Sequence, residues 1–521
     1  MIITSVVPPE LPMELSLAVT NSLLSLTKLS IFCTEPFRIP FAGKVDVVCF
    51  DKTGTLTSDA LEMHGVAGLQ STSLVALEDP QQLVAPAALP TSIQLILAGC
   101  HSLVLAVVLG SSTESDSLGV KLLSKGAPEV MESLFASIPD YYTRVYKHYA
   151  LKGCRVLALG SKTLSTRDLQ RLKTIARSEM EKNLEFGGFL VLDCPVKHDT
   201  TDVIQELKTS KHVLVMITGD NALTALDVAK QTMASLAAST NLCATGDALT
   251  LLTPAQLQLV VRHACVFART SPSQKEAILD ALNQSVVDFQ HVVVWLRRRS
   301  RCGFVTAMCG DGTNDVGALK RAHVGISIIN NPDQPTTTPT EPSSSHVVKF
   351  GDASIASPFT SKQPSIRATC QILCQGRCTL VTTLQMYKIL GINCLLSAYV
   401  LSSLYMYGVK QGDMQMTVVG VVIALFYLFL SYAKPCTRLS ARRPLTRVFC
   451  LSVLLSMGIQ FVVHLATLAA ALDVALPFVD MDDPAMHPEA KFRPNVLNSI
   501  VFVVSLHMQI NTFVVNYHVR R

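Results

Sequence analysis

Acidic residues follow short apolar runs at several places in this chain, where their carboxylates could do chemistry. Asp51 comes directly after the apolar run 47–50 and opens the sequence DKTGTLT. Asp220 lies in ITGDN, and Asp311 and Asp315 lie in GDGTND. A carboxylate can attack phosphorus to form an acyl phosphate, and it is also a ligand that Mg²⁺ prefers. Asp51 alone could be a structural acid, but three such motifs in one chain favour a nucleophile.

Alternating strands and helices must position these acids. The pattern predicts strands at 45–50, 213–217, 305–308 and 324–328, with helices at 200–210, 222–232, 273–283 and 314–322 between them. Strands that alternate with helices indicate a parallel sheet covered on both faces. Because ligands bind at the carboxyl ends of the strands in such sheets, we expect the acidic motifs to share one edge.

Four carboxylates on one edge would repel one another unless a cation neutralised them. Mg²⁺ fits this role because it binds oxygen ligands, keeps several waters and is held by one or two carboxylates plus substrate phosphate. Phosphoryl transfer also needs positive charge and hydrogen-bond donors around the phosphate. Lys275, Thr218 and the backbone amides of the glycine turns could supply them. These residues therefore predict phosphoryl transfer to Asp51.

The motifs DKTGTLT, KGAPE (125–129), ITGDN and GDGTND stand in this order after a proline-broken helix, and here the chain resembles a P-type ATPase. The resemblance implies an α/β fold with a phosphorylation domain of the haloacid-dehalogenase-like Rossmann type. An α+β nucleotide-binding domain would be inserted in it, and a multi-pass α-helical membrane bundle would follow. The implied activity is that of a translocase that hydrolyses ATP and uses Mg²⁺.

The resemblance also implies roles for individual residues. Asp51 would take the phosphoryl group from ATP, and Lys275 would neutralise the phosphate. The Mg²⁺ ion would be held by Asp51, Asp311, Asp315 and the Thr53 carbonyl. The residues expected to orient the phosphate are Thr218, Gly219, Asp220 and Asn314. Nucleotide contacts are expected from Lys125, Gly126 and Arg155, together with Thr218 and Asp220.

The composition is typical of a membrane protein, with a mean hydropathy of +0.37, 49% hydrophobic residues and 16% charged residues. Segments 384–407, 416–432, 448–472 and 496–515 are each about long enough to span a bilayer. The loop 433–447 is strongly basic, so the positive-inside bias places it in the cytoplasm. The acidic loop 473–490 then lies on the opposite side, and the large region 34–383 is cytoplasmic.

The first apolar segment contains the sequence PPELP. Its prolines leave backbone carbonyls without helical partners, which is tolerated at membrane depth only beside protein or a cavity. Ionisable groups inside a membrane are candidates for function. We therefore expect a membrane substrate site at Pro9, Glu10, Pro12 and Glu14, although the two carboxylates could instead lie near the interface.

The sequence PPELPMELS resembles the A branch of the type V P-type ATPases. Those proteins reside in the endoplasmic reticulum membrane and extract mis-inserted transmembrane helices. The resemblance implies client transmembrane helices as partners, besides ATP and the lipid bilayer. A cation- or polyamine-transporting ATPase is the alternative.

The patterns together predict five regions. They are a partial transmembrane helix (1–33), the start of the phosphorylation domain (34–59), a shortened nucleotide-binding domain (60–194), the rest of the phosphorylation domain (195–365) with a linker at 330–346, and the membrane bundle (366–521). The family's actuator domain and last two membrane helices have no counterpart here, and the aromatic adenine platform before KGAPE is missing. We therefore expect a fragment that cannot complete a transport cycle.

Other classes of function fit less well. A haloacid-dehalogenase-like phosphatase normally carries a second acid two residues after the nucleophile, where this chain has Thr53. A catalytically impaired scaffold remains an alternative. The 15 cysteines show neither zinc-ligand spacing nor a disulfide framework. The net charge of +5 and one short basic cluster at 295–301 give no reason to expect a nucleic-acid partner.

Overall fold

The chain folds into two compact units in a computed structural model. The structure describes residues 11–58, 61–69, 82–99, 106–109, 120–164, 181–233, 242–284, 303–311, 315–329, 357–446, 449–479, 493 and 495–517. The first unit comprises Met1–Val48, Gln205–Val213 and Asn283–Arg521, and the second unit comprises Cys49–Ile204 and Leu214–Leu282. Strand β2 (Val47–Phe50) belongs to both, because the boundary falls between its second and third residues.

The first unit contains strands in the order β1-β13-β12-β11-β2. Their bounds are β1 (Ile31–Cys33), β13 (Phe359–Ser361), β12 (Val324–Ile328) and β11 (Thr306–Gly310). Strands β11, β12 and β13 run parallel, whereas β1 is antiparallel to β13. All residues of β11 and β12 are buried, as a parallel sheet covered on both faces requires. Helix α14 (Val316–Arg321) connects these two strands.

In the second unit, the end of β2 is followed across the sheet by β8 (Val213–Ile217), β10 (Ala264–Ala268) and β9 (Leu242–Thr245). Strands β8, β10 and β9 are parallel. The helices that alternate with them are α9 (Thr200–Thr209), α10 (Ala222–Thr232), α11 (Gly246–Thr250), α12 (Pro254–His263) and α13 (Pro272–Gln284). The predicted alternation of strands and helices is therefore confirmed, and β8 and α10 have the predicted bounds.

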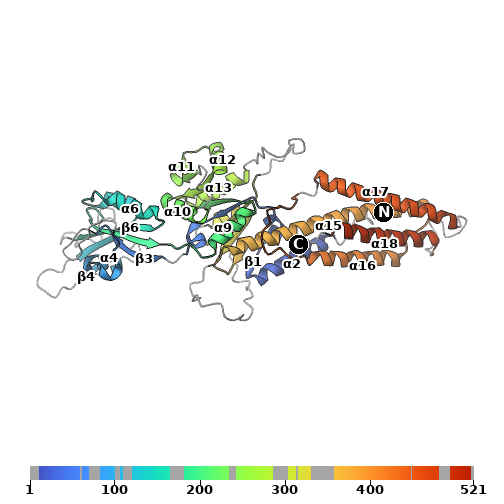
Figure 1. Cartoon of the computed structure of the whole chain (residues 1–521), viewed down its shortest axis with the longest axis horizontal. Coiled ribbons are helices and arrows are strands. Elements are labelled where there is room, and N and C mark those ends of the chain that lie inside the picture. Colours follow the sequence, from blue (N-terminus) through green and yellow to red (C-terminus); the bar gives the residue numbers. More distant parts are fainter. Residues whose placement is uncertain are drawn as a thin grey trace, which may run out of the picture. The chain divides into compact units, whose positions relative to one another are not determined.

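The second unit also contains a five-stranded antiparallel sheet in the order β3-β7-β6-β5-β4. Strands β3, β4 and β6 of this sheet are labelled in Figure 1. The strands are β3 (Glu62–Ala67), β7 (Glu185–Asp193), β6 (Arg155–Thr163), β5 (Val120–Gly126) and β4 (Ala106–Leu109). Alternate residues point to opposite faces. Leu122 and Ala158 pack in one core with helix α6 (Tyr142–Leu151), whereas Leu123 and Leu159 pack in another core with helix α4 (Thr91–Gly99).

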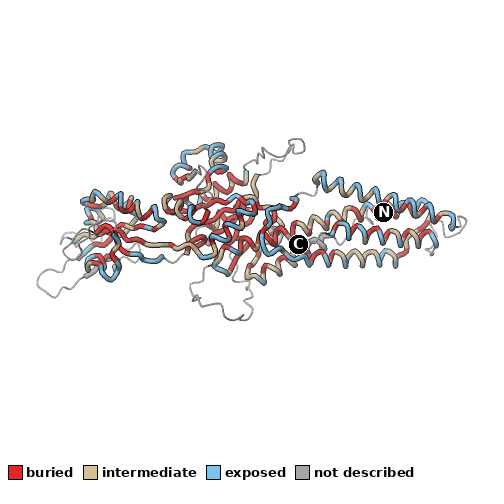
Figure 2. The backbone as a smooth tube through the Cα atoms, viewed as in Figure 1, coloured by how far each residue is buried: buried red, intermediate tan, exposed pale blue. Residues whose placement is uncertain are grey.

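Long helices make up the membrane part of the first unit. They are α2 (Leu11–Lys28), α15 (Arg367–Met406), α16 (Asp413–Ser431), α17 (Leu451–Ala475) and α18 (Val496–Asn516). Four segments in the described residues are long and apolar enough to cross a bilayer, and they contain α15, α16, α17 and α18. Figure 2 shows many exposed residues along these helices, and apolar side chains such as Leu425, Phe429, Ile459 and Val463 are among them. Such faces suit contact with lipid.

Helix α15 extends beyond the predicted membrane segment 384–407 at its start. It begins at Arg367, not at residue 384, and runs for 40 residues. Its first part contains Gln371, Gln375 and Arg377, and these polar residues make it too hydrophilic to be recognised as an apolar membrane segment. This part packs against the short helix α3 (Ile39–Ala42) and continues without a break into the membrane-spanning part.

Short turns complete the architecture. Helix α5 (Pro128–Met131) follows β5 directly, and 3₁₀ turns occur at Pro36–Arg38, Pro86–Ala88, Glu132–Leu134 and Leu476–Phe478. The predicted linker at 330–346 lies outside the described residues.

Candidate functional site

Asp51 follows strand β2, whose four residues are all buried. Its side chain is itself largely buried, and its Oδ1 accepts a hydrogen bond from the backbone N–H of Lys52 at 2.8 Å. The Nζ of Lys275, on helix α13, lies 3.2 Å from the same oxygen. Lys275 is only 4% exposed, so this ammonium and carboxylate interact with little screening by water. The structure therefore brings the predicted nucleophile and the predicted phosphate-neutralising lysine together.

The loop after Asp51 is held in a fixed conformation. Gly54 has φ = +73°, which favours glycine because a side chain would be strained there. Lys197 Nζ donates to the Gly54 carbonyl at 2.8 Å, and Thr200 Oγ1 donates to the Leu56 carbonyl at 3.0 Å. Lys197, just before α9, and Thr200, its first residue, thus fix the turn that contains the Thr53 carbonyl, a predicted Mg²⁺ ligand.

Asp220 lies beside this loop and receives two of its side chains. Its Oδ2 is 2.8 Å from Lys52 Nζ and accepts a hydrogen bond from Thr53 Oγ1 at 2.6 Å. Burial alone would raise the pKa of Asp220, but the charge of Lys52 and the hydrogen bonds from Lys52 and Thr53 outweigh it and hold the pKa below its ordinary value. Asp220 is therefore an anion that positions the loop around Asp51.

Sequence reasoning missed Lys52, which is 2% exposed and interacts with Asp220 beside Thr53. A lysine that follows an aspartate is usually solvated, and its sequence neighbours give no sign of a distant carboxylate partner. The one available signal was that Lys52 lies within DKTGTLT itself, where every polar side chain is a candidate.

Thr218 and Gly219 continue strand β8 into the turn before α10. Thr218 is buried, and its Oγ1 accepts a hydrogen bond from the backbone N–H of Asp220 at 3.1 Å. Its carbonyl accepts hydrogen bonds from both the N–H and Oγ1 of Thr270. Gly219 has open space, since a Cβ there would meet nothing closer than the Thr270 carbonyl at 3.6 Å. The turn could thus admit a phosphate beside Gly219.

Three predicted nucleotide contacts lie on the five-stranded sheet. Lys125 and Gly126 end strand β5, and Arg155 begins the neighbouring strand β6. Gly126 pairs with Ala158, so the ends of the two strands lie close together. The positive charge of Arg155 is also among the causes that lower the pKa of Asp220. Arg155 therefore lies near enough to the acidic turn to interact with an anion bound there.

In the first unit, Asp311 and Asp315 follow strand β11. Asp315 is 1% exposed, and a Cβ on Gly310 would lie 2.5 Å from its Oδ2. Gly310 must therefore stay without a side chain for Asp315 to occupy this position. The Asp315 carbonyl accepts from Leu319 N–H in α14, which fixes the backbone. Asn314, predicted to orient phosphate, lies outside the described residues.

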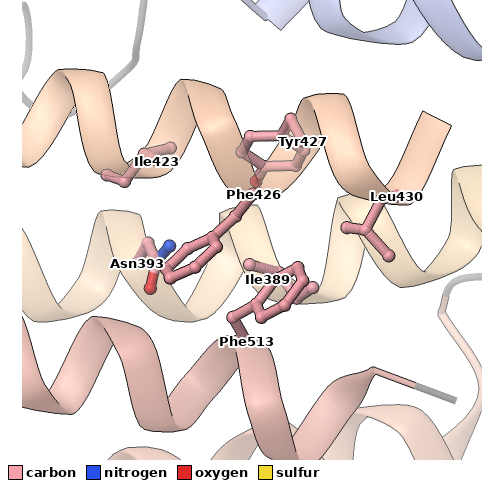
Figure 3. A pocket seen from close by; sticks show the side chains of 7 residues that line it. All are labelled: Ile389, Asn393, Ile423, Phe426, Tyr427, Leu430 and Phe513. Carbon is pink, nitrogen blue, oxygen red and sulfur yellow. The ribbon is translucent and has the colours of Figure 1, made fainter. Parts of the chain in front are cut away.

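The structure describes only part of the predicted membrane site. Pro9 and Glu10 lie outside the described residues, and Pro12 and Glu14 lie in α2, where the backbone alone is described. Elsewhere in the bundle, Figure 3 shows a pocket formed by α15, α16 and α18. Its lining residues are Ile389, Asn393, Ile423, Phe426, Tyr427, Leu430 and Phe513. The lining contains no acid, so this pocket differs in character from the acidic site expected at the PPELP sequence.

Comparison with known proteins finds one family and several relatives that match this chain. Residues 45–323, more than half of the chain, match the family of haloacid dehalogenase-like hydrolases. A probable manganese-transporting ATPase, PDR2, of Arabidopsis thaliana is 37% identical over 99% of this chain and 54% of its own length. The endoplasmic reticulum transmembrane helix translocase of Saccharomyces cerevisiae is 32% identical over 99% of this chain and 56% of its own length.

A third relative is the endoplasmic reticulum transmembrane helix translocase spfA of Aspergillus fumigatus, which is 30% identical over 100% of this chain and 56% of its own length. The chain therefore spans about half the length of the curated relatives it matches. The three alignments run over 665, 707 and 754 residues, so they include segments of the relatives that this 521-residue chain lacks.

The predicted resemblance and fold class are confirmed by these matches together with the mixed sheets and the membrane-length helices. The chain is similar over nearly its whole length to proteins named as transporting ATPases and endoplasmic reticulum transmembrane helix translocases. It belongs to the haloacid dehalogenase-like hydrolases.

Proposed function

We propose that the chain transfers the γ-phosphoryl group of ATP to Asp51, with Mg²⁺ as cofactor. A carboxylate oxygen of Asp51 forms a bond to phosphorus while the bond from phosphorus to the bridging oxygen breaks, and ADP leaves. The observation that carries this proposal is the buried Asp51 carboxylate at the end of β2, with Lys275 Nζ 3.2 Å from Oδ1. Lys275 would neutralise charge on the transferred group, which lowers the barrier to attack by an anion.

The Mg²⁺ ion would be held by Asp51, Asp311, Asp315 and the Thr53 carbonyl. Carboxylate and carbonyl oxygens are the donors that this cation prefers. Both P-type ATPases and haloacid dehalogenase-like hydrolases use Mg²⁺. When bound, the ion would supply positive charge opposite the phosphate oxygens.

The register of the strands supports this grouping. In the first unit, the backbone N–H groups of Asp46 and Val47 both donate to the Val305 carbonyl, so β2 and β11 start side by side. From Asp46 the chain reaches Asp51 in five residues, and from Val305 it reaches Gly310 in five residues. Because residues in neighbouring parallel strands advance by nearly equal steps, Asp51 and the acids after Gly310 would follow adjacent strand ends.

The remaining predicted residues would orient the nucleotide. Lys125, Gly126 and Arg155 would contact ATP from the five-stranded sheet. The residues that would orient its phosphates are Thr218, Gly219, Asp220 and Asn314. Asp220 would act indirectly in this arrangement, because its carboxylate is already engaged by Lys52 and Thr53.

The phosphorylation would drive transport of a hydrophobic helix out of the endoplasmic reticulum membrane. Two relatives that match nearly the whole chain are named as endoplasmic reticulum transmembrane helix translocases. The membrane-length helices of the first unit support a multi-pass location in that membrane. The client would be engaged near Pro9, Glu10, Pro12 and Glu14.

Cation transport is the second candidate, because the relative with 37% identity is named as a probable manganese transporter. The two candidates separate in a measurement on the full-length protein. Stimulation of ATP hydrolysis by Mn²⁺ alone would favour cation transport, whereas stimulation by a purified tail-anchored helix would favour helix extraction.

The nucleophile is tested by labelling with ³²P. The chain, purified in detergent, is incubated with γ-labelled ATP and Mg²⁺ and then quenched in acid. We expect acid-stable label that hydroxylamine removes and that is absent in Asp51→Asn. Label that persists in Asp51→Asn would refute the assignment.

A further inference from the structure

Glu129 connects the five-stranded sheet to the turns that surround Asp220. Its Oε1 accepts one hydrogen bond from Asn221 Nδ2 at 2.9 Å and another from Arg269 NH2 at 3.0 Å. Glu129 follows strand β5, Asn221 follows Asp220, and Arg269 follows strand β10. One carboxylate oxygen therefore joins three segments of the second unit that are distant in sequence.

Hydrogen bonds to other residues also fix the positions of both partners of Glu129. Asn221 caps helix α10 through its Oδ1, which accepts from Leu223 N–H at 3.0 Å. That bond determines the orientation of the amide, so Nδ2 faces Glu129. Arg269 has a left-handed backbone with φ = +54°, and its N–H donates to the Asp220 carbonyl at 2.9 Å. Such a conformation persists only where the surroundings enforce it.

Glu129 is anchored equally well on the side of the sheet. The preceding Pro128 carbonyl accepts a hydrogen bond from the hydroxyl of Tyr142 at 2.8 Å. Tyr142 is 1% exposed and packs against Phe135, Phe186 and Phe189 in the core under the sheet. A displacement of Glu129 would therefore disturb the aromatic core of the nucleotide-binding sheet.

A second contact shows how closely the same two parts approach. Gly153, in the turn between α6 and β6, has φ = +82°, and a Cβ there would lie 2.5 Å from Asp227 Oδ2 on α10. Helix α6 also contacts α10. The five-stranded sheet thus meets α10 at two places, through Glu129 and through Gly153.

We propose that Glu129 is a positioning residue that holds the nucleotide-binding sheet against the turn carrying Asp220. The route runs from Glu129 to Asn221, then along the backbone to Asp220, and on to Lys52 and Thr53 beside Asp51. Glu129 contacts neither Asp51 nor Lys275 in this route. It fixes the distance from Lys125 and Gly126 to the Asp51 carboxylate. It should therefore affect phosphoryl transfer only from donors that bind the five-stranded sheet. This inference rests on the proposed phosphorylation of Asp51.

The test compares two phosphoryl donors on the purified full chain with Mg²⁺. ATP needs the five-stranded sheet, whereas acetyl phosphate has no base or ribose and leaves only acetate when its phosphoryl group passes to Asp51. Glu129→Lys places a cation beside Arg269. We expect its rate of labelling from low concentrations of ³²P-ATP to fall about tenfold, because a misplaced donor loses alignment, while labelling from ³²P-acetyl phosphate stays unchanged. The exchange Glu129→Lys with Arg269→Glu restores the ion pair and should recover most of the ATP rate.

A control variant and the labelling rates with the two donors test the positioning role of Glu129. Glu132→Lys makes the same charge change three residues away and should leave both rates unchanged. Equal loss with both donors in Glu129→Lys would show a general structural defect and overturn the positioning role, as would a wild-type rate with ATP. Absence of label on Asp51 in the wild-type chain with either donor would overturn the proposed function itself.

Discussion

His212 is a buried titratable residue in the turn between α9 and β8, away from the phosphate-accepting acids. Its Nδ1 lies 2.7 Å from Ser210 Oγ, and its Nε2 lies 3.3 Å from Arg377 NH2. Because an arginine always donates, Nε2 must accept and the ring must be neutral with its proton on Nδ1. Burial, followed by the charges of Arg377 and Arg443, lowers the pKa of His212 to about 3.

This lowered pKa predicts a loss of stability in mild acid. Below about pH 6.5 the unfolded chain binds a proton at His212 that the folded chain excludes down to about pH 3. The free energy of unfolding should therefore decrease as the pH is lowered below about 6.5. The slope contributed by this residue should approach about 1.4 kcal/mol per pH unit. Thermal unfolding of the purified protein between pH 7.5 and 5 measures it. In His212→Gln, which cannot titrate, the slope should be smaller.

The control for this experiment is His198→Gln, which removes an exposed imidazole from the same part of the chain. It should leave the pH dependence as in the wild type. If His212→Gln and the wild type lose stability in parallel over this range, then His212 is not the neutral, buried group that the geometry indicates.

Residue types at strand ends could be predicted from the sequence, but most of their pairings could not. Asp51 and Lys275 were assigned from the order of the motifs, and the structure places them 3.2 Å apart. The pairs Lys52–Asp220 and Glu129–Arg269 were not foreseen. Each joins residues from different strands, and only the folded sheet determines which side chains face each other.

At the scale of elements, prediction succeeded where local pattern dominates. Strands β8 and β12 and helix α10 have the predicted bounds, because their apolar periodicity is strong and turn residues flank them. The predicted membrane segment begins 17 residues after the start of helix α15 at Arg367, because Gln371, Gln375 and Arg377 make the first part of the helix too polar to be recognised as an apolar run. This first part of α15 packs against α3.

Two glycines make this packing possible. Gly376 in α15 lies against Gly43, just after α3, and a Cβ on Gly376 would lie 2.5 Å from Gly43 N and 2.7 Å from the Ile39 carbonyl. These are backbone atoms and cannot move aside separately. Gly376→Ala should therefore force α15 and α3 apart and lower the free energy of unfolding by about 1–3 kcal/mol, as overpacking does. Thermal unfolding would measure the change.

Gly420→Ala is the matched control, because Gly420 also lies inside a membrane helix and a Cβ there meets nothing within 4 Å. Alanine favours helix over glycine, so this variant should be at least as stable as the wild type. Equal stability of Gly376→Ala and Gly420→Ala would mean that the contact between α15 and α3 is loose.

At the scale of the whole molecule, the basic loop after α16 determines the sidedness of the membrane helices. Arg443 donates to the Asp46 carboxylate and to the Lys211 carbonyl, and Leu439 N–H donates to Glu206 Oε1 at 2.9 Å. These partners flank strands of the sheet in the first unit. The loop therefore lies on the same side of the membrane as that sheet, in agreement with the positive-inside bias.

This sidedness predicts which thiols an impermeant reagent can reach. Cys436 is exposed in this loop, whereas the 3₁₀ turn Leu476–Phe478 follows α17 at the other end of a membrane-length helix. In sealed endoplasmic reticulum vesicles with the cytoplasmic face outward, a charged maleimide should modify Cys436, as peptide mapping by mass spectrometry would show. Phe478→Cys, at an exposed position, should be modified only after detergent opens the vesicles. Modification of Phe478→Cys in intact vesicles, with Cys436 protected, would show the opposite topology. The sheet of the first unit would then lie in the lumen, where cytoplasmic ATP could not phosphorylate Asp51.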